Sequence, residues 1–286
     1  MATSPVWFIT GASAGLGASI AIAALKAGNR VIATARNPAK AARDVSQVEA
    51  LGGKWLQLDV TASDVREKVE QAVKEYGKLD VVINNAGYSL LGAMEDMSEE
   101  EIHTQFNTNV YGPIRVMKAV LPSMRANRSG TIVNITSIAG LDALSASSMY
   151  AGTKFALEGI SESLAKELAP FNIRVLLVEP GAFRTQFLTA RVKPAAGLTE
   201  EYKDTPVDTV LKNMDAMNGK QPGDPDKAAT RIIEMINGTG MAEGKTGLLR
   251  LLLGPDCLRR AKAKTIGLLE NLDAMEEIAL STNYDN

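Results

Sequence analysis

Short apolar runs rich in Val, Ile and Leu alternate along this chain with segments of helical pattern. The runs TIVNI (131–135) and IRVLLV (173–178) consist almost entirely of aliphatic and β-branched residues. Strands that are buried on both faces have this composition, and parallel sheets are covered on both faces. The seven predicted strands are Val6–Thr10, Arg30–Thr34, Lys54–Leu58, Leu79–Asn84, Gly130–Thr136, Ile173–Val178 and Gly247–Leu253.

Helical segments connect these strands. They are predicted at Leu16–Ala27, Ala62–Tyr76, Glu99–Ala126, Tyr150–Ala169 and Asp226–Ile236, with a last helix at about 255–280. Strand–helix alternation of this kind predicts an α/β fold, a doubly wound parallel sheet of seven strands with helices on both faces. A chain of 286 residues fits one such domain, which we expect to span 1–286.

The bulk composition excludes several classes of protein. The formal net charge is −2 and no basic patch dominates, so a nucleic acid is not the expected partner. No apolar run reaches the ~18 residues of a membrane span. Cys257 is the sole cysteine, which excludes an internal disulfide and favours a reducing compartment. We therefore expect a cytoplasmic protein without a membrane span.

The segment Thr185–Asp224 differs in composition from the rest of the chain. It contains Pro194, Pro206 and Pro222, many charged residues and few strong helix signals. Long insertions in compact folds often serve as lids over a site. We expect a lid-like insertion at about 185–224 that is the least ordered part of the protein without ligands, although a solvated loop explains the composition as well.

The stretch FITGASAGLG (8–17) follows the first predicted strand and matches two motifs. Gly11, Ser13 and Gly15 fit the G-x-S-x-G elbow of serine hydrolases, but that chemistry needs a histidine base. His103 is the only histidine, and it lies in the charged helical pattern SEEEIHTQF. One His and one Cys also cannot form a zinc site, so no metal is expected.

The second motif is a glycine turn that receives the phosphates of a dinucleotide. A strand precedes the turn and a helix follows it, which is the required context. Gly11 permits the tight turn, Gly15 lets the backbone approach a diphosphate, and Gly17 allows the helix to pack closely on the strand. The spacing is G-x-x-x-G-x-G, however, and glycines that only build a turn would explain it about as well.

An ordered set of motifs extends this interpretation along the chain. The motifs are TGASAGLG (10–17), LDVT (58–61), NNAG (84–87), NVYG (109–112), ITSIAG (135–140), YAGTK (150–154) and EPGAFRT (179–185). Together they resemble the short-chain dehydrogenase/reductase family over nearly the whole chain, which implies a Rossmann-type sheet. The segments NNAGYSLLGAMEDMS (84–98) and LVEPGAFRT (177–185) resemble most the subgroup near retinol and 17β-hydroxysteroid dehydrogenases.

The resemblance implies four catalytic residues, Asn109, Ser137, Tyr150 and Lys154. Tyr150 corresponds to the family's proton donor, and Lys154 lies four residues on, so both share a helix face. The ammonium of Lys154 and an oxidised nicotinamide are expected to lower the tyrosine pKa from about 10. Ser137 would bind the substrate oxygen, and Asn109 would anchor a water in the proton relay.

The resemblance also implies a nicotinamide cofactor. The residues expected to bind it are Gly11, Ser13, Gly15, Leu16, Gly17, Arg36, Asp59, Val60, Asn85, Ala86, Gly87, Tyr150, Lys154, Pro180, Gly181 and Thr185. An acidic residue at the end of the second strand selects NAD. Ala35 stands there instead, or Thr34 if the strand ends one residue earlier, and neither is acidic. Arg36 follows, so we expect NADP(H), with Arg36 and Ser13 on the 2′-phosphate.

Two function classes remain open at this stage. The first is an NADP(H)-dependent oxidoreductase of a carbonyl or secondary alcohol, with a hydrophobic small-molecule substrate. The second is a nucleotide-sensing or scaffold protein with the same fold and no catalysis, although sensors tend to lose the tyrosine or the lysine. In family members the helices around Glu99–Ala126 and Tyr150–Ala169 often pair, which implies a homo-dimer or homo-tetramer.

Overall fold

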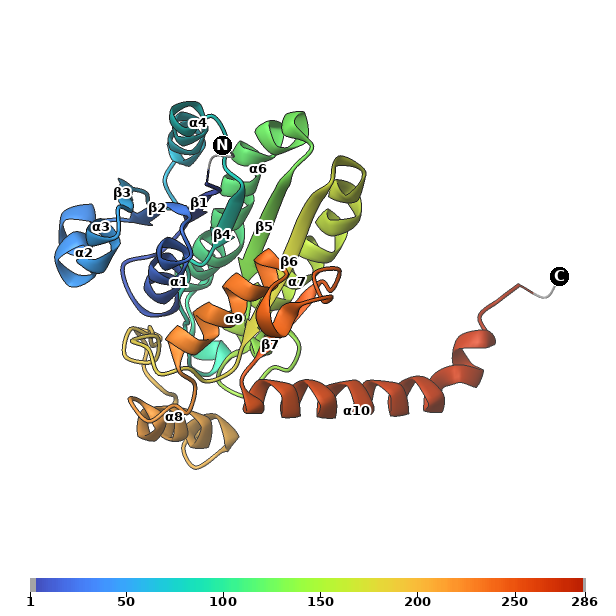
Figure 1. Ribbon diagram of the computed structural model, residues 1–286. Coiled ribbons are helices and arrows are strands. Elements are labelled where there is room, and N and C mark those ends of the chain that lie inside the picture. The colour runs from blue at the N-terminus through green and yellow to red at the C-terminus, as the bar shows by residue number, and fades with distance from the viewer. Residues whose placement is uncertain (1–3, 285–286) are drawn as a thin grey trace.

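The computed structural model describes residues 4–284 and contains one sheet (Figure 1). Its strands are β1 (Val6–Ile9), β2 (Arg30–Ala35), β3 (Lys54–Gln57), β4 (Val81–Asn84), β5 (Gly130–Ile135), β6 (Ile173–Pro180) and β7 (Arg250–Leu253). They pair in parallel in the order β3-β2-β1-β4-β5-β6-β7. The predicted seven-stranded, doubly wound fold is confirmed.

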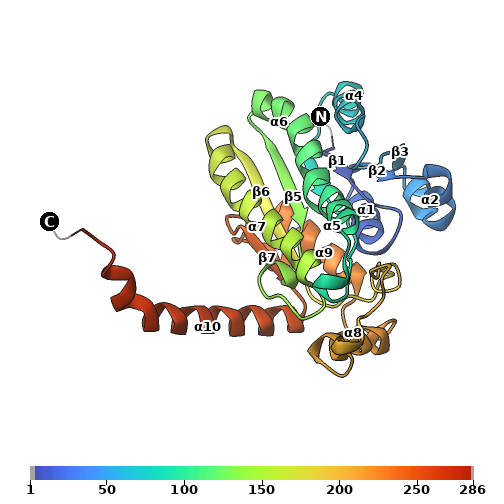
Figure 2. The ribbon, with the colours of Figure 1, turned by 180° about the vertical axis from the view of Figure 1, so that it is seen from behind.

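Helices cover both faces of the sheet (Figure 2). One face carries α1 (Gly15–Lys26) and α9 (Pro225–Asn237), and the other carries α4 (Val65–Tyr76), α6 (Gly112–Asn127) and α7 (Ser148–Leu168). Successive strand side chains point to opposite faces. Trp7 therefore lies in the core beside α1 and α9, whereas Phe8 lies in the core beside α4 and α6. Apolar cores on both sides explain the nearly unbroken apolar runs.

The single helix predicted at Glu99–Ala126 is three consecutive pieces in the structure. These are α5 (Glu99–Phe106), the π-helical turn η2 (Asn107–Tyr111) and α6. Pro113 lies in the first turn of α6 and has no N–H group to continue the α-helical hydrogen-bond ladder. Such π turns inside helices often occur at functional sites. This turn carries Asn109.

Further helices were not among the sequence-based predictions. They are α2 (Pro38–Asp44), α3 (Gln47–Ala50) and α8 (Pro206–Met217). Both α2 and α8 begin at a proline that follows a capping side chain, Asn37 and Thr205 respectively. Proline at the first helical position is a common start signal. The expectation of few helix signals in Thr185–Asp224 is therefore wrong, because α8 forms inside that segment.

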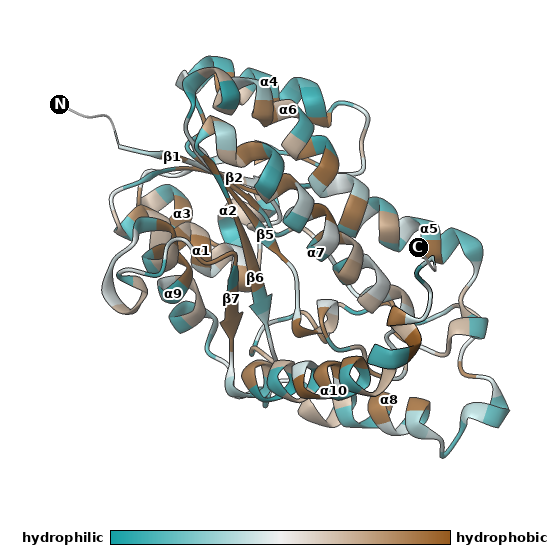
Figure 3. Cartoon of the chain, turned by 90° about the vertical axis from the view of Figure 1, so that its right-hand side faces the viewer, coloured by the Kyte–Doolittle hydropathy of each residue, from teal (hydrophilic) through white to brown (hydrophobic). Residues whose placement is uncertain are grey.

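Some element boundaries shift by a few residues from the prediction. For example, α4 begins at Val65 and not at Ala62, and β7 begins at Arg250 and not at Gly247. Short 3-10 turns complete the fold at Met94–Asp96, Ile138–Gly140, Ala169–Phe171, Glu200–Tyr202 and Gly240–Ala242. The last helix, α10 (Pro255–Leu280), follows β7. Figure 3 shows apolar residues gathered on the strands and on the helix faces turned toward them.

Candidate active site

Four side chains of the predicted catalytic set lie on elements at the carboxyl ends of the central strands. Ser137 follows the end of β5, and Tyr150 and Lys154 lie in the first half of α7. Asn109 lies in the π turn before α6. In open parallel sheets, ligands bind outside this edge, near the point where the strand order reverses.

Asn109 is held by hydrogen bonds to the loop after β4. Its Oδ1 accepts from the N–H of Tyr88 at 3.1 Å, and its Nδ2 donates to the Tyr88 carbonyl at 2.9 Å and to Thr153 Oγ1 at 3.2 Å. The side chain is buried. Since Thr153 lies on α7 next to Lys154, Asn109 connects the π turn to the helix that carries Tyr150 and Lys154.

Lys154 is buried, and its ammonium donates to the carbonyl of Ile135 at 2.9 Å. This bond joins α7 to the end of β5, two residues before Ser137. Burial lowers the pKa of Lys154 to about 8, although the charge of Glu158 acts in the opposite direction. The ammonium lies 5.7 Å from the centroid of the Tyr150 ring.

Tyr150 is buried under the segment that follows β6. Its ring centroid lies 5.7 Å from that of Phe187. Burial raises the pKa of Tyr150 to about 12, and interaction with the Ser137 hydroxyl lowers it only in part. The direction is opposite to the lowering expected from Lys154 and an oxidised nicotinamide, because desolvation of the phenolate dominates in the protein by itself.

The glycine turn has the backbone geometry that only glycine adopts freely. Gly11 and Gly15 have φ values of +64° and +55°. A Cβ on Gly11 would lie 2.8 Å from the Cα of Ala86, and one on Gly15 would lie 3.2 Å from the Cβ of Thr185. A Cβ on Gly17 would lie 2.4 Å from Nδ2 of Asn85. Residues from three predicted motifs therefore meet around the turn.

Thr10 and Asn85 hold the turn in place. The Asn85 amide donates to the carbonyls of Thr10 and Gly11 at 3.0 and 2.9 Å. In return, Thr10 Oγ1 accepts from the backbone N–H groups of Asn85 and Ala86 at 2.9 and 3.0 Å. Thr10 was absent from the predicted site residues. The motif TGASAGLG contained it, but its partner could not be identified without the structure.

The comparisons with known proteins agree with this geometry. A model of the short chain dehydrogenase family matches residues 5–195. The chain belongs to the short-chain dehydrogenase/reductase family. This is a family of oxidoreductases.

Individual family members are similar over most of the chain. The oxidoreductase claN of Passalora fulva is 50% identical over 73% of this chain and 95% of its own length. A 3-ketodihydrosphingosine reductase of Bacteroides thetaiotaomicron is 40% identical over 80% of this chain and 83% of its own length. A short-chain dehydrogenase from Streptomyces avermitilis is 35% identical and superposes with a TM-score of 0.85, covering 99% of this chain and all of its own.

Two further solved structures of such enzymes hold a nicotinamide cofactor. ElxO with NADP bound is 28% identical with a TM-score of 0.72, covering 90% of this chain and 100% of its own. Actinorhodin polyketide ketoreductase with NADPH, carrying a substitution of its own, is 28% identical with a TM-score of 0.72, covering 88% of this chain and 97% of its own.

The residues predicted to bind adenosine lie at the ends of β2 and β3. Ala35 is the last residue of β2, and the exposed Arg36 follows it. Burial opposes ionisation of Asp59, but hydrogen bonds from Thr61 and the charges of Arg36 and Lys68 outweigh it, so the pKa of Asp59 is lowered. Asp59 is therefore a carboxylate near Arg36, at the carboxyl end of β3.

Other predicted cofactor residues have structural reasons within the chain. Gly181 follows β6, and a Cβ there would lie 2.3 Å from a carboxylate oxygen of Asp256. Pro180 pairs with Leu253 of β7. The carbonyl of Val60 accepts from Arg115 at 3.2 Å. Each of these residues shapes the backbone beside the site. The glycine turn and the start of α1 contain Ser13, which is exposed, and Leu16, which packs against the core. The loop after β4 contains Gly87.

The insertion Thr185–Asp224 covers the tyrosine. The N–H of Val192 donates to the Ser89 carbonyl at 2.8 Å, which fixes the insertion to the loop after β4. From α8, Leu211 and Met214 pack against a buried cluster that includes Tyr150. The sequence pattern did not predict the helix α8 or these contacts.

His103 lies on the exposed side of α5 and lines a shallow pocket with Glu100, Thr104, Asn107, Tyr111 and Arg115. Within residues 4–284, no group of three or more His, Cys, Asp or Glu side chains is arranged to hold a metal. The same part of the chain has no helix with the length and apolar character of a membrane span.

Replacing Gly17 with alanine is predicted to damage nucleotide binding. The new Cβ would lie 2.4 Å from Asn85 Nδ2 and 2.5 Å from the Gly11 carbonyl, so the bonds that shape the turn must shift. Overpacking of this kind costs about 1–3 kcal/mol. We expect Gly17→Ala to lower the melting temperature and weaken binding of NADPH, measured by fluorescence titration.

Gly159→Ala is the matched control. Gly159 lies on the exposed side of α7 with nothing within 4 Å of its would-be Cβ, so alanine should raise helix stability by about 0.5–1 kcal/mol and leave NADPH binding unchanged. Wild-type affinity in Gly17→Ala would show that the turn does not receive the nucleotide.

Proposed function

We propose that this protein is an NADP(H)-dependent oxidoreductase that interconverts a hydrophobic ketone and its secondary alcohol. The observation that carries the proposal is the buried pair Tyr150 and Lys154 beside Ser137, with Lys154 fixed to β5 through the Ile135 carbonyl. The glycine turn lies at the same edge of the sheet. A proton donor and a nucleotide cradle therefore face one region.

The glycine turn fits a dinucleotide. Among the described residues, no side chain caps the N-terminus of α1 at Ala14, so the first N–H groups of this helix are available to phosphate oxygens. Gly15 and Thr185 leave the approach to these groups without a bulky side chain. When bound, the nicotinamide supplies or accepts the hydride.

In this mechanism the chain's own residues position the carbonyl and supply the proton. The Ser137 hydroxyl donates a hydrogen bond to the substrate oxygen and stabilises it as negative charge develops. Tyr150, whose pKa is raised to about 12, is protonated at neutral pH and carries the phenolic proton that it donates to that oxygen. The Lys154 ammonium stabilises the resulting phenolate, and Asn109 orients the proton path toward Lys154.

NADP(H) is favoured over NAD(H) by the last residue of β2 and the residue that follows it. Ala35 offers no carboxylate to a ribose hydroxyl, and the exposed Arg36 guanidinium can bind a 2′-phosphate. The NADP in ElxO and the NADPH in the polyketide ketoreductase support this assignment. Ser13 is exposed in the glycine turn and would add a hydroxyl.

The substrate is proposed to be apolar around its carbonyl. Side chains in contact near Tyr150 are Leu91, Ala139, Phe187, Leu211 and Met214. The names of two similar proteins, a 3-ketodihydrosphingosine reductase and a polyketide ketoreductase, support ketone reduction. The narrower resemblance to retinol and 17β-hydroxysteroid dehydrogenases is part of the same proposal.

Movement and assembly complete the proposal. The insertion Thr185–Asp224 acts as a lid, since it covers Tyr150, and slower amide exchange in this segment with NADPH bound would report its closure. Protected amides before NADPH addition would contradict a lid that opens.

We also propose a homo-dimer or homo-tetramer paired through α5, α6 and α7, as the family resemblance implies. A monomeric mass in sedimentation would contradict this assembly.

A nucleotide sensor without catalysis is the alternative from another class. Replacing Tyr150 with phenylalanine separates the two. Phenylalanine keeps the ring that packs on Phe187 but removes the proton donor, and general acid catalysis is typically worth ~10²–10⁴ in rate. We expect Tyr150→Phe to lose kcat by this factor with NADPH affinity close to that of the wild type, measured on a panel of hydrophobic ketones.

Tyr76→Phe is the control, because it removes a phenol at the end of α4 and should leave turnover unchanged. If Tyr150→Phe retained more than about a tenth of kcat, Tyr150 would not be the donor. If the wild type bound NADPH but turned over no carbonyl or alcohol, the sensor would be the correct assignment.

Changing Ala35 and Arg36 should abolish the preference for NADPH. A charge-assisted hydrogen bond from Arg36 to the 2′-phosphate is worth roughly 1.5–3 kcal/mol, or about tenfold to a hundredfold in kcat/KM. In the double variant Ala35→Asp, Arg36→Leu that preference for NADPH over NADH should be lost, since the new carboxylate repels the phosphate. Arg43→Leu on α2 is the control. Equal use of NADH and NADPH by the wild type would overturn the NADP(H) assignment alone.

A further inference from the structure

Most of α10 has no packing partner in the chain. Cys257 and Ala261 in its first turns are buried against the body of the protein. From Lys262 to Leu280 every residue is exposed. Figures 1 and 2 show this helix extending away from the rest of the molecule, to one side of the sheet.

An apolar stripe follows the whole length of α10. It recurs at intervals of three and four residues, through Leu258, Ala261, Thr265, Leu268, Leu272, Met275 and Ala279. This is the spacing of the contact face in paired helices. Leu268 and Leu272 are 52% and 64% exposed, so the stripe continues past the body with nothing against it.

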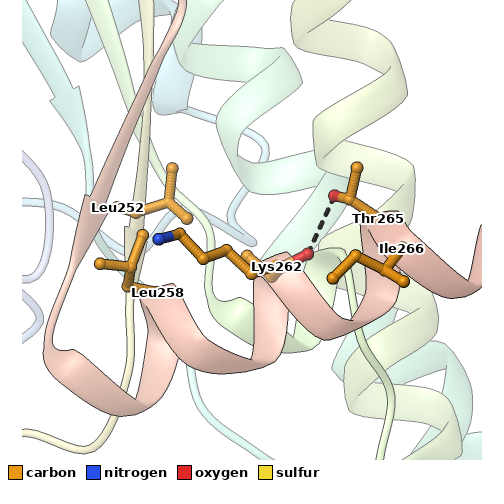
Figure 4. Close-up of a pocket in the computed structure, with 6 residues that line it drawn as sticks. Leu252, Leu258, Lys262, Thr265 and Ile266 are labelled. Carbon is orange, nitrogen blue, oxygen red and sulfur yellow. Dashed lines mark hydrogen bonds between the residues drawn. The ribbon is translucent and has the colours of Figure 1, made fainter.

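The stripe begins at an open apolar groove. The groove has a volume of about 360 Å³ and is lined by Leu252 of β7 and by Leu258, Ala261, Lys262, Thr265 and Ile266 of α10 (Figure 4). The figure shows Leu252 and Leu258 beside the Lys262 side chain at the base of the helix. The groove and the exposed stripe therefore form one continuous surface.

The charges of α10 are separated along its length. Arg259, Lys262 and Lys264 lie in the first half, whereas Glu270, Asp273, Glu276 and Glu277 lie in the second. Among the salt bridges of the described residues, none includes any of these seven side chains. A helix dipole favours the opposite order, with acidic residues first and basic residues last. The order therefore does not stabilise the isolated helix.

We propose that α10 is a docking arm for a second copy of this chain, and that the two α10 helices pair antiparallel. In this arrangement the basic half of each helix faces the acidic half of the other, and the two helix dipoles oppose each other. The distal leucines of one arm then reach the groove at the base of the other. The contact is symmetric and closes on itself, as expected for a two-fold dimer. An anionic membrane fits less well, because it would repel the acidic half.

Charge reversal tests this pairing by sedimentation velocity on the full-length protein. The variant Lys262→Glu, Lys264→Glu places acidic side chains in the basic half of α10, and the variant Glu276→Lys, Glu277→Lys places basic side chains in its acidic half. Each variant alone should have about half the wild-type assembly mass, because like charges then face each other. An equimolar mixture of the two should recover the full mass, since in the antiparallel arrangement the new acidic side chains of one arm face the new basic side chains of the other.

Two further variants complete the test. Lys26→Glu, Lys74→Glu reverses two exposed charges elsewhere and should keep the wild-type mass. Leu272→Ser should reduce the mass without changing charge, and the circular dichroism spectrum should remain that of a folded protein. Unchanged mass in both charge variants would overturn the proposal, as would a loss of mass that mixing does not restore. Binding of anionic lipid vesicles through α10, with no change of mass, would assign the arm to a membrane instead.

Discussion

The hydrogen bonds between Thr10 and Asn85 are the constraint on which the site depends. They join the end of β1 to the end of β4, the two neighbouring strands between which the strand order reverses. Because the Asn85 amide occupies both the Thr10 and the Gly11 carbonyls, the glycine turn has one geometry. That geometry leaves no room for a side chain at Gly17 and directs the start of α1 toward the nucleotide site.

Burial sets the chemistry on the other side of the site. Desolvation moves the pKa of Tyr150 up to about 12 and that of Lys154 down to about 8. Both shifts favour the neutral side chain, so the phenol of Tyr150 is protonated in the protein by itself. The segment after β6 contributes to this burial through Phe187, whose ring contacts that of Tyr150.

The sequence predicted the elements that follow from simple periodicities, and it missed those that depend on a local break or a distant partner. The strands were predictable because parallel strands are apolar on both faces. The π turn at Asn109 was not, since a helix interrupted near Pro113 has the same apolar pattern as a continuous one. Thr205 and Pro206 are a helix start signal for α8, but the polar composition around them favoured a loop. The upward pKa shift of Tyr150 could not be predicted, because it depends on how deeply the side chain is buried and residue spacing does not report burial. The exposure of α10 likewise required the structure, because its apolar spacing is equally that of a helix packed on a core.

Hydride transfer is the central claim, and isotopic labelling measures it most directly. NADPH carrying deuterium at the transferred position of the nicotinamide is incubated with the enzyme and a ketone that it reduces, and the product alcohol is analysed by mass spectrometry. The account predicts one deuterium at the carbinol carbon of each product molecule, with one NADPH oxidised for each. The account would be contradicted if the product alcohol carried no deuterium whichever face of the nicotinamide was labelled. Consumption of NADPH without formation of alcohol would also contradict it.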